Sequence, residues 1–195
     1  MAIEARPDGH GFRWTDEGGT PVVEAFHAVR RMTYASTGSR DPAELVRTGR
    51  GACTAKHLLL CQLLRGLGVQ ARVLTVAGSF GAGLPEAPGM PETLKAMIRD
   101  GGVADFHNVV EAELDGETVL LDATWHDALA PAGFPVNADW QGRGSTRLAV
   151  LGTVMDSATA DPLDGKAALI AALSAHERER RLRFLTLMTQ YSVAQ

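Results

Sequence analysis

The chain has 195 residues, 45% of them hydrophobic and 22% charged, and a formal net charge of −4. This length predicts one domain over residues 1–195, with a core at about 22–155 and a C-terminal helix at about 164–193. The acidic balance argues against a nucleic-acid-binding surface, which is normally basic. No apolar run approaches the roughly 18 residues that cross a bilayer, and the first residues lack the apolar segment of a signal peptide.

The two cysteines, Cys53 and Cys61, are too few for a disulfide framework, which favours a reducing compartment and a cytoplasmic protein. Arginine outnumbers lysine by 16 to 3, and alanine and glycine are frequent. This bias is typical of a GC-rich bacterial genome. Neither a membrane nor a nucleic acid is an expected partner.

Two helices are predicted ahead of the first cysteine. Residues 21–34 carry apolar side chains three and four positions apart, which indicates an amphipathic helix. Asp41 and Pro42 favour the start of a second, short helix, because aspartate caps helix N-termini and proline fits the first helical position. That helix is expected to end near Arg47.

A central helix is predicted over residues 53–67. Its leucines lie on most of its sides, which is typical of a helix buried in the middle of a domain, and Cys61 is expected in that core. Gly66 and Gly68 end the helix. A strand follows at residues 69–77.

Glycine and proline are dense in residues 78–102, where a short helix at 92–99 is the only regular element expected. This segment joins the strand after the central helix to a strand that carries His107. We therefore expect a mobile loop that lies over the functional site.

A β-hairpin is predicted next, because the Asp115-Gly116 pair favours a two-residue turn between strands at 106–114 and 117–124. A last strand is expected at 147–154. The order of elements indicates an α+β fold, in which an antiparallel sheet packs on one buried helix that carries Cys53 near its N-terminus.

The hairpin also predicts which residues are neighbours. A two-residue turn pairs Leu114 with Glu117, and the same register makes His107 and Asp122 diagonal neighbours on one face of the sheet. That face is expected to pack on the central helix. It should also hold Val109 and Leu120, with Asn108 and Leu121 on the opposite face.

Cys53 lies at the expected start of the central helix, after Gly51 and Ala52. Unpaired backbone N–H groups and the positive end of the helix dipole favour a thiolate there, and the thiolate is the reactive form of cysteine. With His107 and Asp122, this thiol makes a Cys-His-Asp arrangement. The acid orients the imidazole, the imidazole activates the thiol and later protonates the leaving group, and the thiol forms a thioester.

The motifs around these residues resemble the transglutaminase-like superfamily, over residues 25–125. The resemblance implies a papain-like, cysteine-protease-like core and a catalytic triad of Cys53, His107 and Asp122. In chain order the motifs are GAC at 51–53, LRGLGVQARV at 64–73, FHNVVE at 106–111 and LDATW at 121–125.

The resemblance also bears on residues around the triad. The family has an aromatic residue ahead of its cysteine, and Tyr34 is the matching candidate for the oxyanion site. Asn108-Val109 replaces the Ala-Trp that commonly follows the family's histidine, and residues 54–56 (TAK) stand where glycine or an acidic residue is frequent. Asn108, Trp125 and Trp140 are further candidates for oxyanion or substrate contacts.

The expected activity is thiol-dependent acyl transfer through a Cys53 thioester, as amide hydrolysis or transfer to an amine. A peptide or a small acyl compound is the expected substrate, with no cofactor and no metal. Two alternatives stay open: a catalytically idle domain that binds a peptide or protein partner, and an arylamine N-acetyltransferase-like enzyme with the same triad. His57 and His126 are alternative bases.

The charged face of the helix at 164–193 favours solvent exposure or a dimer contact.

Overall fold

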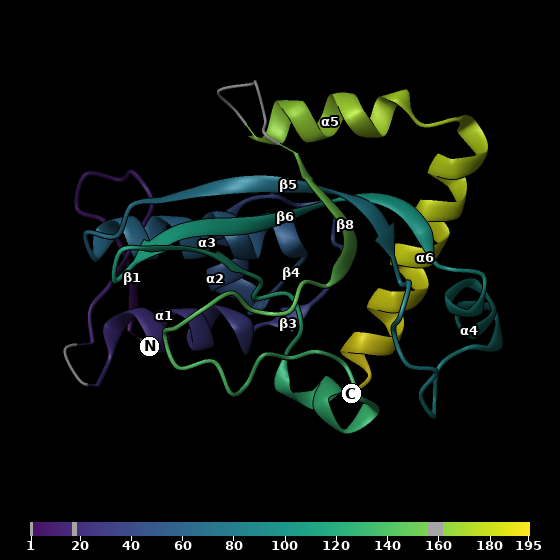
Figure 1. Ribbon diagram of the computed structural model, residues 1–195, viewed down its shortest axis with the longest axis horizontal. Coiled ribbons are helices and arrows are strands. Elements are labelled where there is room, and N and C mark those ends of the chain that lie inside the picture. Colours follow the sequence, from purple (N-terminus) through teal and green to yellow (C-terminus); the bar gives the residue numbers. More distant parts are fainter. Residues whose placement is uncertain (1, 17–18, 156–161) are drawn as a thin grey trace.

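The computed structural model describes residues 2–16, 19–155 and 162–195 and contains a four-stranded antiparallel sheet (Figure 1). The sheet strands are β5 (Ala71–Phe80), β6 (Val103–Leu114), β7 (Glu117–Leu121) and β8 (Val150–Met155), in the order β7-β6-β5-β8. Two short ribbons pair β1 (Ile3–Ala5) with β2 (Phe12–Trp14), and β3 (Thr33–Tyr34) with β4 (Arg50–Gly51). The helices are α1 (Pro21–Arg30), α2 (Pro42–Thr48), α3 (Cys53–Gly66), α4 (Glu92–Arg99), α5 (Pro162–Ala172) and α6 (Ala175–Val193), with a 3-10 segment η1 (Asp127–Ala132).

This arrangement confirms the α+β class and the antiparallel sheet. Helix α3 packs against β5 and β6, while Figure 1 shows α5 running alongside β5 and α6 passing one end of the sheet. In the described residues, no helix has the length and apolar character needed to cross a membrane.

Helix α3 is buried as expected. Leu59, Leu60, Leu63 and Leu64 are fully buried, and Cys61 is 4% exposed in the same apolar cluster. This cluster also takes in α1 and one face of the β6–β7 hairpin. A second cluster, built on Trp125, joins α4 and α6 to the sheet. The residues of α3 therefore sit between the N-terminal helices and the sheet, which fixes where Cys53 lies.

The predicted hairpin register is correct, but the predicted faces are wrong. Leu114 pairs with Glu117, and the ladder runs on to Val110 opposite Leu121. Val110 and Leu121 pack with the leucines of α3, whereas Val109 belongs to the cluster around Trp125. The strand β7 ends at Leu121, so Asp122 leaves the ladder and the alternation of faces no longer places its side chain.

Residues 78–102 contain more regular structure than expected, and the helix expected at 92–99 is present as α4. Strand β5 runs on to Phe80, and α4 buries Leu94, Met97 and Ile98 in the core. Gly78 serves a close approach between strands, because it pairs with Gly152 of β8 and a Cβ there would overlap the Leu151 carbonyl. Burial of the apolar side chains of this segment therefore gives it an ordered fold despite its many glycines and prolines.

The helix expected at 164–193 is two helices. Helix α5 ends at Ala172 and α6 begins at Ala175, after a capping box in which the Ser174 side chain accepts from the Glu177 N–H and Glu177 accepts from the Ser174 N–H. The bend lets α5 lie alongside the sheet while α6 contacts β6. Both helices thereby reach the candidate site.

Candidate active site

Cys53 is the first residue of α3, and its position is fixed by the parallel β3–β4 ribbon just before it. Helix α1 ends at Arg30 rather than at residue 34, and Tyr34 pairs with Gly51 in that ribbon. Gly51 packs closely there, because a Cβ would meet the Leu45 side chain at 3.0 Å and Leu45 would have to shift. The Cys53 thiol therefore lies at a helix N-terminus, where backbone N–H groups lack partners within the helix.

His107 and Asp122 are brought into direct contact. The Nε2 atom of His107 lies 2.8 Å from Asp122 Oδ2, and both side chains are 1% exposed. The charge of the Cys53 thiolate helps to raise the pKa of His107, and the charge of His107 helps to lower the pKa of Cys53. Of the three residues that the sequence singled out, Asp122 and His107 are in direct contact, and His107 interacts electrostatically with Cys53.

The Asp122 carboxylate is held by backbone groups as well. Its Oδ2 atom accepts from the Ala149 N–H at 2.7 Å, and Oδ1 accepts from the Thr124 N–H at 3.0 Å. These donors fix the carboxylate from the loop that follows β7 and from the start of β8. The acid is therefore oriented before any substrate binds.

The three groups have strongly perturbed pKa values. Burial alone would raise the pKa of Cys53, but Lys166 and His107 hold it well below its usual value. Burial disfavours the imidazolium, yet the charges of Asp122 and the Cys53 thiolate raise the pKa of His107 to about 10. Burial opposes ionisation of Asp122, yet His107 keeps its pKa well below the usual range. At neutral pH the arrangement favours thiolate, imidazolium and carboxylate together.

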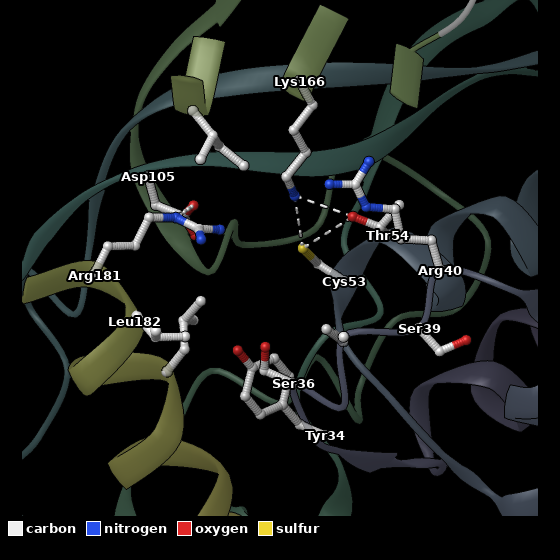
Figure 2. Close-up of a pocket in the computed structure, with 14 residues that line it drawn as sticks. Tyr34, Ser36, Ser39, Arg40, Cys53, Thr54, Asp105, Lys166, Arg181 and Leu182 are labelled. Carbon is white, nitrogen blue, oxygen red and sulfur yellow. Dashed lines mark hydrogen bonds and ion pairs between the residues drawn. The ribbon is translucent and has the colours of Figure 1, made fainter. Parts of the chain in front are cut away.

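A pocket of about 210 Å³ opens onto the thiol (Figure 2). One side is polar and cationic, with Arg40 and Lys166, and the other is apolar, with side chains from α5 and α6. The lining residues are Tyr34, Ser36, Gly38, Ser39, Arg40, Ala52, Cys53, Thr54, Asp105, Lys166, Ile170, Arg181, Leu182 and Leu185.

The family follows from a comparison of the sequence. Residues 16–123, more than half of the chain, match the model of the transglutaminase-like superfamily. The chain belongs to this superfamily. It matches no curated protein. Among solved structures it is similar to a candidate cysteine protease from Cytophaga hutchinsonii, at 20% identity and a TM-score of 0.38, over 53% of this chain and 30% of that chain.

The resemblance read from the motifs is therefore confirmed, and membership of the transglutaminase-like superfamily supports a thiol-dependent activity. The matched region holds Cys53, His107 and Asp122 but stops before α5 and α6. Those two helices supply Lys166, Arg181 and much of the apolar side of the pocket. In this transglutaminase-like chain, the pocket is thus completed by residues outside the matched region.

Lys166 is the main residue of the site that sequence reasoning missed. It is 4% exposed, and its Nζ atom lies 3.5 Å from Cys53 Sγ. Figure 2 shows the Lys166 side chain reaching down from α5 to the thiol. A second missed feature is the pair of Asp105 and Arg181, joined at 2.6 Å across β6 and α6.

The other candidates of the transglutaminase-like motif take different places. Tyr34 lines the pocket beside Cys53, and burial followed by the thiolate charge raises its pKa well above the usual value. Asn108 lies behind the pocket, where its Oδ1 atom accepts from Thr54 Oγ1 at 2.8 Å. Trp125 is a core residue that packs on Tyr34, with ring centroids 4.9 Å apart. Trp140 packs on Phe26 in the cluster around α3, and neither tryptophan lines the pocket.

The two alternative bases do not line the pocket either. His57 accepts from the Ala123 N–H at 2.9 Å and is fully buried behind Asp122. His126 accepts from the Tyr34 N–H at 3.4 Å, and burial lowers its pKa to about 4. Both imidazoles thus help to hold the backbone around the site.

A buried lysine anchors the same region. The Nζ atom of Lys56 donates to the backbone carbonyls of Arg30 at 3.0 Å, Met32 at 2.8 Å and Thr124 at 2.8 Å. These bonds join α3 to the end of α1 and to the segment after Asp122. The departure from the family pattern at this position therefore has a structural use.

Within residues 2–16, 19–155 and 162–195, no cluster of three or more histidine, cysteine or acidic side chains could hold a metal ion.

Proposed function

We propose that this chain is a thiol-dependent enzyme that forms a thioester on Cys53 and passes the acyl group to water or to an amine. The observation that carries the proposal is the buried contact of His107 with Asp122 at 2.8 Å, beside a pocket that is lined by Cys53 and in which the charge of His107 favours the Cys53 thiolate. The same three groups also belong to the region that matches the superfamily.

The steps follow from the charges of these groups. The Cys53 thiolate attacks the acyl carbon, and the carbonyl oxygen takes up the negative charge. His107, already an imidazolium, protonates the leaving group as the tetrahedral intermediate collapses to a thioester. The neutral imidazole then accepts a proton from the incoming water or amine. Asp122 holds the ring through Nε2 and stabilises the imidazolium.

The pocket supports an acyl group carried by a peptide or a small molecule. Its volume of about 210 Å³ holds a few side-chain-sized groups, and its apolar side consists of Ile170, Leu182 and Leu185. Burial of His107 and Asp122 keeps water away from the ion pair, which strengthens it. Because Cys53 is the first residue of α3, the N–H groups of the first helical turn lack partners within the helix and are available to an oxyanion formed next to the thiol.

The proposal is tested by the rate at which iodoacetamide alkylates each thiol as a function of pH, followed by peptide mass spectrometry. Cys53 is expected to react well below pH 8.5, the ordinary thiol value. Cys61 is an internal control, because burial raises the pKa of its thiol and outweighs the opposing charge of Arg65. Alkylation of Cys53 that begins only above pH 8, or that does not differ from that of Cys61, would favour a catalytically idle domain instead.

A further inference from the structure

The contacts of Lys166 are unusual for a surface helix. Its ammonium group has three donors, and three acceptors lie around it: Cys53 Sγ at 3.5 Å, Thr54 Oγ1 at 3.0 Å and Asn108 Oδ1 at 3.1 Å. No carboxylate is among these partners. A lysine that is 4% exposed needs a negative charge nearby, and in this site the Cys53 thiolate provides it.

Two of the three acceptors are themselves fixed. Thr54 Oγ1 donates to Asn108 Oδ1 at 2.8 Å, and Asn108 Nδ2 donates to the Leu74 carbonyl and to Thr75 Oγ1, both at 3.4 Å. Helix α3 and strands β5 and β6 thus hold the oxygen atoms that hold the lysine. The third N–H of Lys166 is thereby directed at the sulfur.

We propose that Lys166 is a further catalytic residue, which stabilises the Cys53 thiolate at rest and then the oxyanion that forms when the thiolate attacks. This inference rests on the proposed thioester chemistry. In the attack a carbon–sulfur bond forms, and the electron pair of the carbonyl double bond moves to oxygen. The negative charge therefore moves from the sulfur to an oxygen two bonds away, and Lys166 neither gains nor loses a proton.

The direction of that charge movement favours Lys166. Its donors to Thr54 and Asn108 stay in place, so the ammonium group is held while its third N–H turns from sulfur to oxygen. A donor fixed in advance, in a site with little water, is the arrangement that stabilises developing charge most effectively. The stabilisation of the resting thiolate has the same origin, and the positive charge of Lys166 contributes to the low pKa of Cys53.

The other cations of the pocket are placed differently. Arg181 is engaged with Asp105 at 2.6 Å, which neutralises its charge. Arg40 is exposed and lines the pocket, and in the described part of the chain the structure gives it no hydrogen bond to the sulfur. In Figure 2 the dashed lines join Lys166, Thr54 and Cys53, whereas Arg40 stands beside them. Arg40 is therefore the matched control for a general effect of positive charge.

The test compares two reactions of Cys53, both on the plateau of their pH profiles where the thiol is fully ionised. Alkylation by iodoacetamide forms no oxyanion, whereas acylation by p-nitrophenyl acetate does. In Lys166→Met, we expect acylation to slow about a hundredfold, while plateau alkylation changes little and its pH profile moves to higher pH. Lys166→Arg should keep part of the acylation rate. Arg40→Gln, which removes a positive charge of the pocket that makes no hydrogen bond to the sulfur in the described residues, should slow acylation far less than Lys166→Met.

Three results would overturn the inference. Equal slowing of both reactions in Lys166→Met would assign the lysine a role in packing or access alone, with circular dichroism to show that the variant is folded. Faster acylation in Lys166→Met would show that the Lys166 side chain blocks access to the thiol and must move before substrate can bind. If Arg40→Gln slowed acylation as much as Lys166→Met, the overall positive charge of the pocket, and not the position of Lys166, would explain the effect. Failure of the proposed function would look different, because the natural chain itself would then show no low-pH alkylation of Cys53.

Discussion

Replacing Asp122 by asparagine tests how far the carboxylate supports both the fold and the chemistry. The aspartate accepts three hydrogen bonds: from His107 and the Ala149 N–H on Oδ2, and from the Thr124 N–H on Oδ1. An asparagine has one acceptor oxygen and one NH2 donor. If its oxygen faces His107 and Ala149, the NH2 group meets the Thr124 N–H.

The flipped asparagine is no better, because its NH2 group then meets the Ala149 N–H. In either orientation one buried backbone donor loses its acceptor, which costs about 1–3 kcal/mol of unfolding free energy. For a chain of this size, that corresponds to a fall in melting temperature of about 2–12 °C. The fold should survive, since the α3 and hairpin clusters are untouched.

The effect on the reaction should be larger. Asparagine cannot stabilise the His107 imidazolium, and in the flipped orientation it favours the wrong tautomer of the ring, so acylation should slow by about ten-thousandfold. The assay is the burst of p-nitrophenolate on mixing with p-nitrophenyl acetate, alongside thermal unfolding followed by circular dichroism.

Asp115→Asn is the matched control, because it makes the same change at the hairpin turn, where Asp115 has a φ of 50° that asparagine also tolerates. It should leave acylation unchanged. An Asp122→Asn chain that acylates nearly as fast as the natural one would refute the reasoning, and would assign the role of the acid to another group near His107.

Three further predictions concern stability. The pKa of His107 is raised from 6.5 to about 10, so the stabilising contribution of its positive charge is complete below pH 6.5 and is lost as the pH rises toward 10. The difference in unfolding free energy between the natural chain and His107→Gln, measured by urea titration, should therefore shrink from pH 6.5 to about pH 10. Lys56→Met should lower the unfolding free energy by on the order of 3 kcal/mol, because three buried backbone carbonyls lose their donor. Lys95→Met is the control, because the Lys95 side chain is partly exposed and its loss should change the unfolding free energy little. Equal losses of stability in the two variants would contradict this role of Lys56. Gly78→Ala should push β8 away from β5, because the new Cβ overlaps the Leu151 carbonyl, and unchanged thermal stability would show that the strands can shift without cost.

Cys53, His107 and Asp122 could be singled out as candidates from the sequence because each has a strong local signal. The Asp115-Gly116 turn sets the register of the β6–β7 ladder up to Val110 and Leu121, which lie between the turn and the pair of His107 and Asp122, and the GAC motif at 51–53 places Cys53 at the start of a helix. His107 and Asp122 are 15 residues apart, so a single hairpin brings them together. The predicted faces were wrong because the prediction places His107 on the face that packs on α3, whereas Val110 and Leu121 fill that face; Asp122 lies just beyond the ladder and is held by Ala149.

The rest of the pocket had no such signal. Lys166 is 113 residues from Cys53, and nothing in the pattern of a C-terminal helix indicates that one lysine turns inward. Its inward position depends on where α5 lies, which the helix break at Ser174 determines. The capping box at that break is visible in the sequence, so two helices could have been predicted. The structure of residues 78–102 was harder to predict, because its many glycines and prolines suggest an irregular loop, whereas the burial of apolar side chains such as Leu94 depends on the tertiary fold.

The thioester on Cys53 is the central claim, and intact mass spectrometry after a brief incubation with p-nitrophenyl acetate and an acid quench tests it most directly. We expect one added acetyl group, mapped to Cys53 by peptide analysis, absent in Cys53→Ala and removed on addition of an amine. Acetylation that is spread over lysines, and that is the same in Cys53→Ala as in the natural chain, would contradict it.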